Sequence, residues 1–120
     1  MNYRHAFHAG NFADVHKHLV LVALLERLKR KPTPMFFLDT HAGRGRYDLQ
    51  STDATRGGEW HNGIGLLAGV AVNSEDARRY LERCEATKQP VRDYLGSPLL
   101  AVRSLRDIDR LVFVEKQPME

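Results

Sequence analysis

Two short apolar segments, each followed by an acidic residue, constrain the fold of this chain most strongly. Residues 35–38 (MFFL) precede Asp39, and residues 111–114 (LVFV) precede Glu115. Runs of apolar residues without alternation are typical of strands that are buried on both faces, as in parallel sheets. A turn that contains two glycines follows the first segment at residues 43–45. This pattern predicts an α/β fold with buried parallel strands.

A long amphipathic helix is predicted before the first strand. Asn11 is a candidate N-cap, and apolar residues recur at steps of three or four from residue 15 to residue 28. The helix should end near Arg30, because Pro32 and Pro34 follow.

The middle of the chain is predicted to form a helical insert between two parts of one core. Residues 48–58 are polar and loop-like, and a glycine-weakened helix is predicted over residues 59–72. A stronger helix, capped by Ser74, is predicted over residues 75–87. We therefore expect a first core part at residues 1–47, an insert at residues 48–95 and a second core part at residues 96–120.

Three features at the ends of these elements are candidates for a nucleotide-type cofactor site. Gly43 and Gly45 follow the first strand, where a turn lets the backbone approach a ligand in doubly wound folds. Glu115 follows the next strand, where an acid binds ribose hydroxyls, although the insert must explain why it lies beyond the usual distance of about 20 residues. Ser97 is a candidate helix cap with Pro98 at the first helical position, and free N–H groups at a helix start bind anions. A tight turn, a solvated acid and a plain cap are the alternatives.

Four of the six histidines lie within residues 3–18 (YRHAFHAGNFADVHKH). Asp14, Lys17 and His18 share one face of the predicted helix, so this face either meets a polar ligand or is solvated. The histidines show no standard zinc spacing, which disfavours a metal site. A metal-dependent nuclease built on these histidines is nevertheless one alternative function.

The composition narrows the class of protein. A net charge of +3 and a pI near 9.2 permit nucleic-acid binding without requiring it. The longest apolar run, residues 19–25, is far short of the roughly 20 residues that a membrane helix needs, and the N-terminus has no apolar signal core. The single cysteine, Cys84, fits a reducing compartment. These features predict a cytoplasmic protein without a membrane partner.

Several longer stretches resemble a known family. YRHAFHAGNFADVHKH, FFLDTHAGRGRYDL, GSPLLA and VFVEKQP resemble the bacterial 23S ribosomal RNA adenine-N6 methyltransferases of the RlmJ family, which also carry an older label for competence and use of external DNA. The resemblance spans the whole chain. It implies a Rossmann-like class I methyltransferase core with an inserted helical subdomain, S-adenosylmethionine as cofactor, and 23S rRNA, free of ribosomal proteins or partly assembled, as partner. It also implies cofactor contacts at His18, His41, Ser97 and Glu115, and substrate or closing contacts at Tyr3, His5 and Lys17.

One motif of this family is absent from the sequence. The family's catalytic Asp-Pro-Pro-Tyr holds the exocyclic amine and stacks on the flipped base, yet the 120 residues contain no Pro-Pro pair. We therefore expect the N-terminal part of a longer enzyme, with no catalytic residue in this chain and no activity on its own. Arg4, Arg44 and Arg46 would suit RNA phosphate. The alternative is a non-enzymatic nucleic-acid-binding protein linked to use of external DNA.

Overall fold

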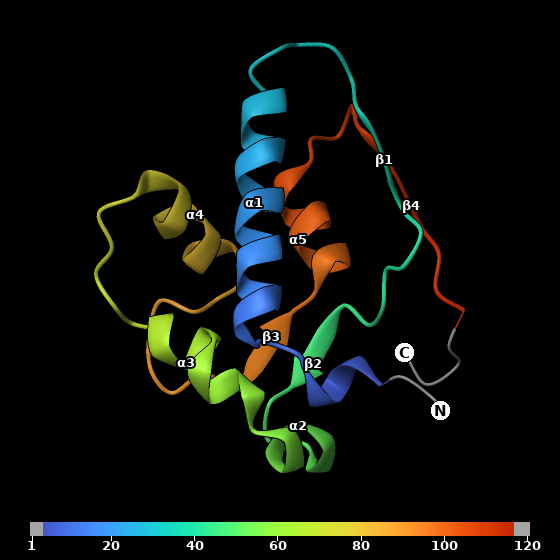
Figure 1. The fold of residues 1–120 in the computed structure, drawn as a ribbon. Helices are drawn as coiled ribbons and strands as arrows, with labels where there is room; N and C mark the ends of the chain where they lie inside the picture. Colours follow the sequence, from blue (N-terminus) through green and yellow to red (C-terminus); the bar gives the residue numbers. More distant parts are fainter. Residues whose placement is uncertain (1–3, 117–120) are drawn as a thin grey trace.

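The computed structural model describes residues 4–116, and its strands form two separate pairs (Figure 1). The first pair is parallel and joins β1 (Phe36–Asp39) to β4 (Arg110–Phe113), with Asp39 opposite Phe113. The second pair is antiparallel and joins β2 (Arg46–Asp48) to β3 (Asp93–Leu95). The two predicted strands and their parallel direction are thus confirmed, whereas β2 and β3 were not predicted.

The predicted long helix is confirmed as α1 (Phe12–Leu28), which follows the short arm helix η1 (His5–Phe7). The Asn11 side chain accepts a hydrogen bond from the backbone N–H of Asp14 at 2.9 Å, which satisfies a free donor at the helix start. Val22 and Leu25 are buried in the core. Figure 1 shows α1 running through the centre of the molecule, with α4 and α5 packed against it.

Helix α5 (Ser97–Ser104) connects the antiparallel pair to β4 and packs against both strands of the parallel pair. Its start corrects one prediction, since Ser97 is not the N-cap. Gly96 takes that position with extended backbone angles, and Pro98 is the second helical residue. The Ser97 hydroxyl instead donates to the carboxylate of Asp39, so it is unavailable for capping.

The chain between β2 and β3 forms short helices: α2 (Thr52–Gly57), η2 (Glu59–Asn62), α3 (Ile64–Leu67) and α4 (Glu75–Arg83). The predicted polar loop at residues 48–58 is wrong, because Ser51 caps α2 by accepting from the N–H of Ala54 at 3.2 Å. The single helix predicted from residue 59 is also wrong, because Gly63 has φ −118° and ψ −109° and interrupts it. Ser74 caps α4 as predicted, although that helix ends earlier than residue 87. The predicted domain boundaries stay a prediction.

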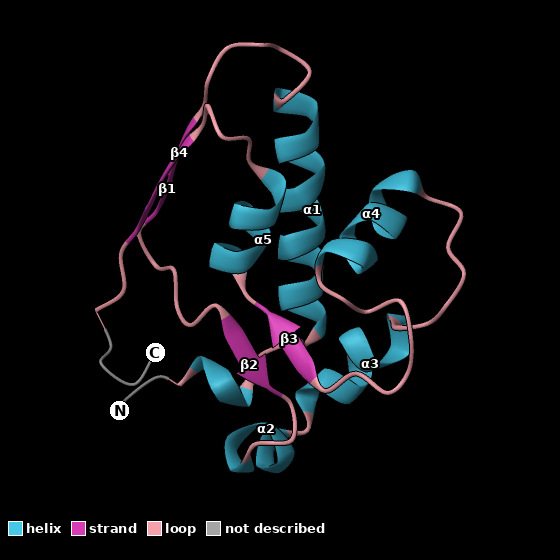
Figure 2. Cartoon of the chain, turned by 180° about the vertical axis from the view of Figure 1, so that it is seen from behind, coloured by secondary structure: helices cyan, strands magenta, loops and turns pink. Residues whose placement is uncertain are grey.

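The hydrophobic core lies around α1, the antiparallel pair and α4, and not around the parallel pair. Tyr80, Tyr94 and Leu100 are fully buried there. Phe36 and Leu38 of β1 are 64% and 52% exposed, and every residue of β4 is exposed, so the prediction of buried strands is wrong. The reason is visible in Figure 2, where the parallel pair lies at the margin of the molecule and α5 approaches it from one side. Within residues 4–116, no helix is both long enough and apolar enough to span a membrane.

Candidate functional site

A cavity of about 560 Å³ opens at the carboxyl ends of β1 and β4. Its walls come from the arm, α1, the turn after β1, the start of α5 and the segment after β4. Six of the seven predicted binding residues line it together, namely His5, Lys17, His18, His41, Ser97 and Glu115. The seventh, Tyr3, lies outside the described residues. Side chains that are far apart in the sequence therefore meet at one site.

The glycine turn and the acid after β4 hold each other in place. The backbone N–H of Gly43 donates to the Glu115 carboxylate at 2.6 Å. Gly43 has φ +68°, and a Cβ at this position would lie 2.7 Å from the hydroxyl of Tyr47. That hydroxyl accepts from the N–H of Arg44 at 3.1 Å. The turn therefore requires glycine, and it fixes Glu115 at the rim of the cavity.

Asp39 positions two of the predicted cofactor residues. Its carboxylate accepts from the backbone N–H of His41 at 3.1 Å and from the Ser97 hydroxyl at 2.5 Å. The hydroxyl of Thr40 is 3.0 Å from Nδ1 of His41. Asp39 was not among the predicted site residues, although its place at the end of the first strand was a usable signal.

Asp14 links the arm to α1. Its carboxylate accepts from Nε2 of His5 at 2.6 Å and from the N–H of Gly10 at 3.1 Å, and it lies 3.4 Å from the Lys17 ammonium. Burial alone would raise the pKa of Asp14, which is 3% exposed, but the hydrogen bond from His5 and the nearby Lys17 ammonium lower it overall. Asp14 is therefore ionised at neutral pH. The alternative of a solvated helix start is wrong for Asp14 and for the buried His18.

His18 is held by a buried pair of tyrosines that sequence reasoning missed. Its Nδ1 lies 2.7 Å from the hydroxyl of Tyr94, which lies 2.9 Å from the hydroxyl of Tyr80. The pKa of His18 is lowered to about 4, mainly by burial, with Lys17 acting in the same direction and Asp14 opposing the shift. The imidazole is therefore neutral at physiological pH. Nothing in the local sequence around either tyrosine signals this contact.

The other histidine of the arm has a structural partner. Nδ1 of His8 lies 2.9 Å from the Glu59 carboxylate, which also accepts from the Asn11 amide at 3.1 Å. These bonds tie the arm and the start of α1 to η2. Across residues 4–116, no group of three or more His, Cys, Asp or Glu side chains is arranged to hold a metal ion. The described histidines thus give a metal-dependent nuclease no support.

The arginines proposed for RNA phosphate have protein contacts. Arg4 lies 3.6 Å from the Asp53 carboxylate, and the Arg44 guanidinium stacks over the ring of Tyr47 at 5.5 Å from its centre. Arg46 lies within 3.4 Å of two carboxylates, those of Glu85 and Asp93. A role for these arginines toward RNA stays a prediction.

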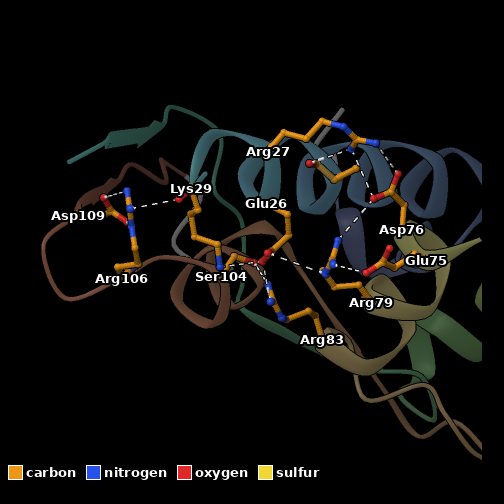
Figure 3. Close-up of polar contacts among 11 residues, drawn as sticks. Glu26, Arg27, Lys29, Glu75, Asp76, Arg79, Arg83, Ser104, Arg106 and Asp109 are labelled. Carbon is orange, nitrogen blue, oxygen red and sulfur yellow. Dashed lines mark hydrogen bonds and ion pairs between the residues drawn. The ribbon is translucent and has the colours of Figure 1, made fainter. Parts of the chain in front are cut away.

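A second hollow, of about 170 Å³, lies between α1 and α4 and is lined by charged side chains. Figure 3 shows ion pairs and hydrogen bonds among charged side chains in and beside this hollow. The Arg83 guanidinium lies 2.6 Å from the carboxylate of Glu26, and the Arg27 guanidinium lies 2.9 Å from that of Asp76. The network therefore joins the helices and is a structural feature.

Comparisons with known proteins give a consistent result. A family model described as "Ribosomal RNA large subunit methyltransferase D, RlmJ" matches residues 32–120. Proteins named "Ribosomal RNA large subunit methyltransferase J" from Haemophilus influenzae and Escherichia coli are 43% and 41% identical, over all of this chain and 44% of their own length. A crystal structure of protein LPL1258 from Legionella pneumophila matches 93% of this chain and 42% of its own, with a TM-score of 0.80 and 36% identity.

The chain thus spans less than half the length of these relatives. The family match covers most of the chain, and the relatives are similar along all of it. The chain therefore belongs to the RlmJ family of ribosomal RNA large subunit methyltransferases.

Proposed function

We propose that this chain forms the cofactor-binding part of a methyltransferase that uses S-adenosylmethionine to methylate N6 of an adenine in 23S rRNA. The family, whose members carry rRNA methyltransferase names, supports the reaction class. The observation that carries the proposal is the cavity at the carboxyl ends of two parallel strands, beside the start of a crossover helix. Open α/β sheets bind their ligands at this edge, and a Rossmann-like class I core interrupted by an insert at residues 48–95 would place its cofactor there. An rRNA substrate implies a cytoplasmic enzyme.

The residues present fit such a cofactor. The cavity has the size of a small-molecule site. Two positions of its wall require glycine, since a Cβ at Gly43 would meet Tyr47 and a Cβ at Gly96 would lie 2.7 Å from the carbonyl oxygen of Arg44. The bound cofactor supplies an electrophilic methyl group on a sulfonium. An acid, a hydroxyl and two imidazoles at the walls match its ribose and amino-acid groups.

Each residue has a proposed task. Glu115 binds the ribose hydroxyls, and Ser97, His18 and His41 contact the remaining polar groups of the cofactor. His5 and Lys17 form the side of the cavity that faces the adenine. Tyr3 is proposed to contact the same substrate. Asp14 keeps His5 and Lys17 in position through the contacts described above.

The test is a calorimetric titration of the purified chain with S-adenosylhomocysteine. We expect binding by the folded chain, and weaker binding by Glu115→Gln. The matched control is Asp48→Asn, since Asp48 lies at the end of β2 and does not line the cavity. A folded chain that binds DNA or RNA but gives no heat with this ligand would overturn the proposal in favour of the nucleic-acid-binding alternative.

A second assay concerns catalysis. Because the sequence contains no Asp-Pro-Pro-Tyr, nothing in this chain would align the adenine amine for attack. We expect no methylation of unmodified 23S rRNA fragments by the purified chain. Methyl incorporation at an adenine would show that the reacting amine is aligned by other residues of this chain.

A further inference from the structure

A buried chain of hydrogen bonds connects the helical segment between β2 and α5 to the cavity. It starts at Tyr80 on α4, passes through Tyr94 on β3 and ends at Nδ1 of His18 on α1. The exposed fractions of the three side chains are only 1%, 1% and 2%. Water therefore has little access to the bonds, and the three groups must satisfy one another.

The direction of these bonds follows from the available partners. A neutral imidazole has one N–H, so either Tyr94 donates to Nδ1 or Nδ1 donates to Tyr94. If Nδ1 donates, Tyr94 would donate to Tyr80, and the hydrogen of the Tyr80 hydroxyl would need a different acceptor. Within the described part of the chain, no oxygen or nitrogen other than the Tyr94 hydroxyl bonds to it. Its sulfur neighbour, Cys84, is a weak acceptor whose thiol points to the carbonyl of Leu81 at 3.7 Å.

If Tyr94 instead donates to Nδ1 of His18, neither phenol hydrogen lacks an acceptor. Tyr80 donates to Tyr94, and Tyr94 donates to Nδ1 of His18, so both phenol hydrogens have good acceptors. Burial raises the pKa of both phenols, which keeps them protonated as donors. The imidazole proton then sits on Nε2.

Nε2 is the ring atom that His18 has left for a ligand. His18 lines the cavity, its Nδ1 is engaged by Tyr94, and no residue from 4 to 116 hydrogen-bonds to its Nε2. The nearby titratable groups, Asp14 and Lys17 on the same helix and His5 on the arm, contact one another through the Asp14 carboxylate.

We propose that Tyr94 is a positioning residue that fixes His18 as the Nε2–H tautomer, so that the cavity presents a neutral hydrogen-bond donor to its ligand. The group bound at this point is then an acceptor, such as a carboxylate or hydroxyl oxygen, and not a cation. The assignment of that acceptor to the methyl donor rests on the proposed function. The tautomer itself does not, because it is set within the protein.

The test is ¹⁵N NMR of the histidine rings in the full 120-residue chain, with His18→Gln used only to assign the His18 signals. Long-range proton–nitrogen spectra distinguish a protonated ring nitrogen from an unprotonated one directly. We expect wild-type His18 to show Nε2–H and an unprotonated Nδ1 near neutral pH. An Nδ1–H signal in the wild-type chain would overturn the proposal without any variant.

Two variants separate positioning from packing. Tyr94→Phe removes the donor to Nδ1 and should give a mixture of tautomers. Tyr80→Phe removes an equally buried hydroxyl one bond further away and should leave His18 as Nε2–H, because Tyr94 still donates. If Tyr94→Phe folds, by circular dichroism, and keeps the pure wild-type tautomer, Tyr94 does not set it.

Ligand binding gives the second readout. The affinity for S-adenosylhomocysteine should fall in Tyr94→Phe in proportion to the lost fraction of the Nε2–H tautomer, about twofold for an equal mixture, and should be unchanged in Tyr80→Phe. A wild-type chain that shows the Nε2–H tautomer but binds no ligand would contradict the proposed function and leave the positioning role intact. Equal weakening in both variants would contradict the specific role of Tyr94.

Discussion

Replacing Asp14 with asparagine tests whether one buried carboxylate holds the arm against α1. Asparagine has nearly the same shape and keeps an oxygen that can accept from the N–H of Gly10. It removes the negative charge that faces His5 at 2.6 Å and Lys17 at 3.4 Å. The variant therefore isolates the electrostatic part of the contact.

The expected loss follows from these two partners. A buried hydrogen bond to a charged group, such as that from His5, contributes about 1.5–3 kcal/mol. The Lys17 ammonium is 63% exposed, so its ion pair adds less than about 1 kcal/mol. We expect Asp14→Asn to lower the free energy of unfolding by about 2–3 kcal/mol, which corresponds to a fall of about 10 °C in Tm for a chain of this size.

The effect should depend on pH in a defined direction. The pKa of Asp14 is lower in the folded chain than in the unfolded chain, where it is about 3.9. The ionised carboxylate therefore contributes stability that is fully present above about pH 4 and is lost as the pH falls through the folded-state pKa. The deficit of the variant relative to wild type should be present at pH 7 and pH 5 and smaller at pH 3.

Urea unfolding followed by circular dichroism at these three pH values measures the deficit. Asp53→Asn is the matched control, because Asp53 pairs with Arg4 of the same arm at 3.6 Å on the surface. That control should lose less than about 1 kcal/mol. A loss below about 1 kcal/mol for Asp14→Asn as well, or a deficit that persists unchanged at pH 3, would refute the reasoning.

Three further outcomes follow from the site. Gly43→Ala should lower the free energy of unfolding, measured with urea, by more than the roughly 1–2 kcal/mol of left-handed backbone strain, because the new Cβ also meets Tyr47. Gly58→Ala is the control and should cost the strain alone, since Gly58 has φ +62° and its Cβ would have no contact closer than 3.8 Å. Ser97→Ala should weaken S-adenosylhomocysteine binding in calorimetry, since the hydroxyl lines the cavity and is fixed by a carboxylate; unchanged affinity would remove Ser97 from the site. Burial raises the pKa of Cys84 to about 12, so a thiol reagent at pH 8 should react only as the chain unfolds, and rapid labelling of the folded chain would contradict this.

The sequence predicted those elements whose signals are local. The cap at Asn11 and the apolar periodicity after it marked α1, and the cap at Ser74 marked α4. Strands β2 and β3 were missed because each has only three residues with polar neighbours, and so short a segment cannot be distinguished from a loop by its local sequence. Burial of β1 was mispredicted, because an apolar run shows only that a strand could be buried. Whether the strand is buried depends on which elements pack against it.

The candidate site shows the same division. The glycines, the strand-end acid and the resemblance predicted seven site residues, of which six line one cavity. Two residues that hold them, Asp39 and Tyr94, were missed as site residues, because their contacts join positions far apart in the chain. Ser97 and Asp39 are 58 positions apart, and His18 and Tyr94 are 76 positions apart. Local spacing carries no information on such pairs.

Contacts between described residues hold several side chains of the cavity wall in place. Asp14 holds His5, and Gly43 holds Glu115. None of these bonds involves the exposed apolar side chains of the parallel pair, such as Phe36. Covering those faces would therefore add stability to the sheet without breaking these bonds, while the proposed methyl transfer would also require the Asp-Pro-Pro-Tyr motif that is absent from this sequence. We accordingly expect cofactor binding and catalysis to be separable, with the first measurable in the chain as it stands.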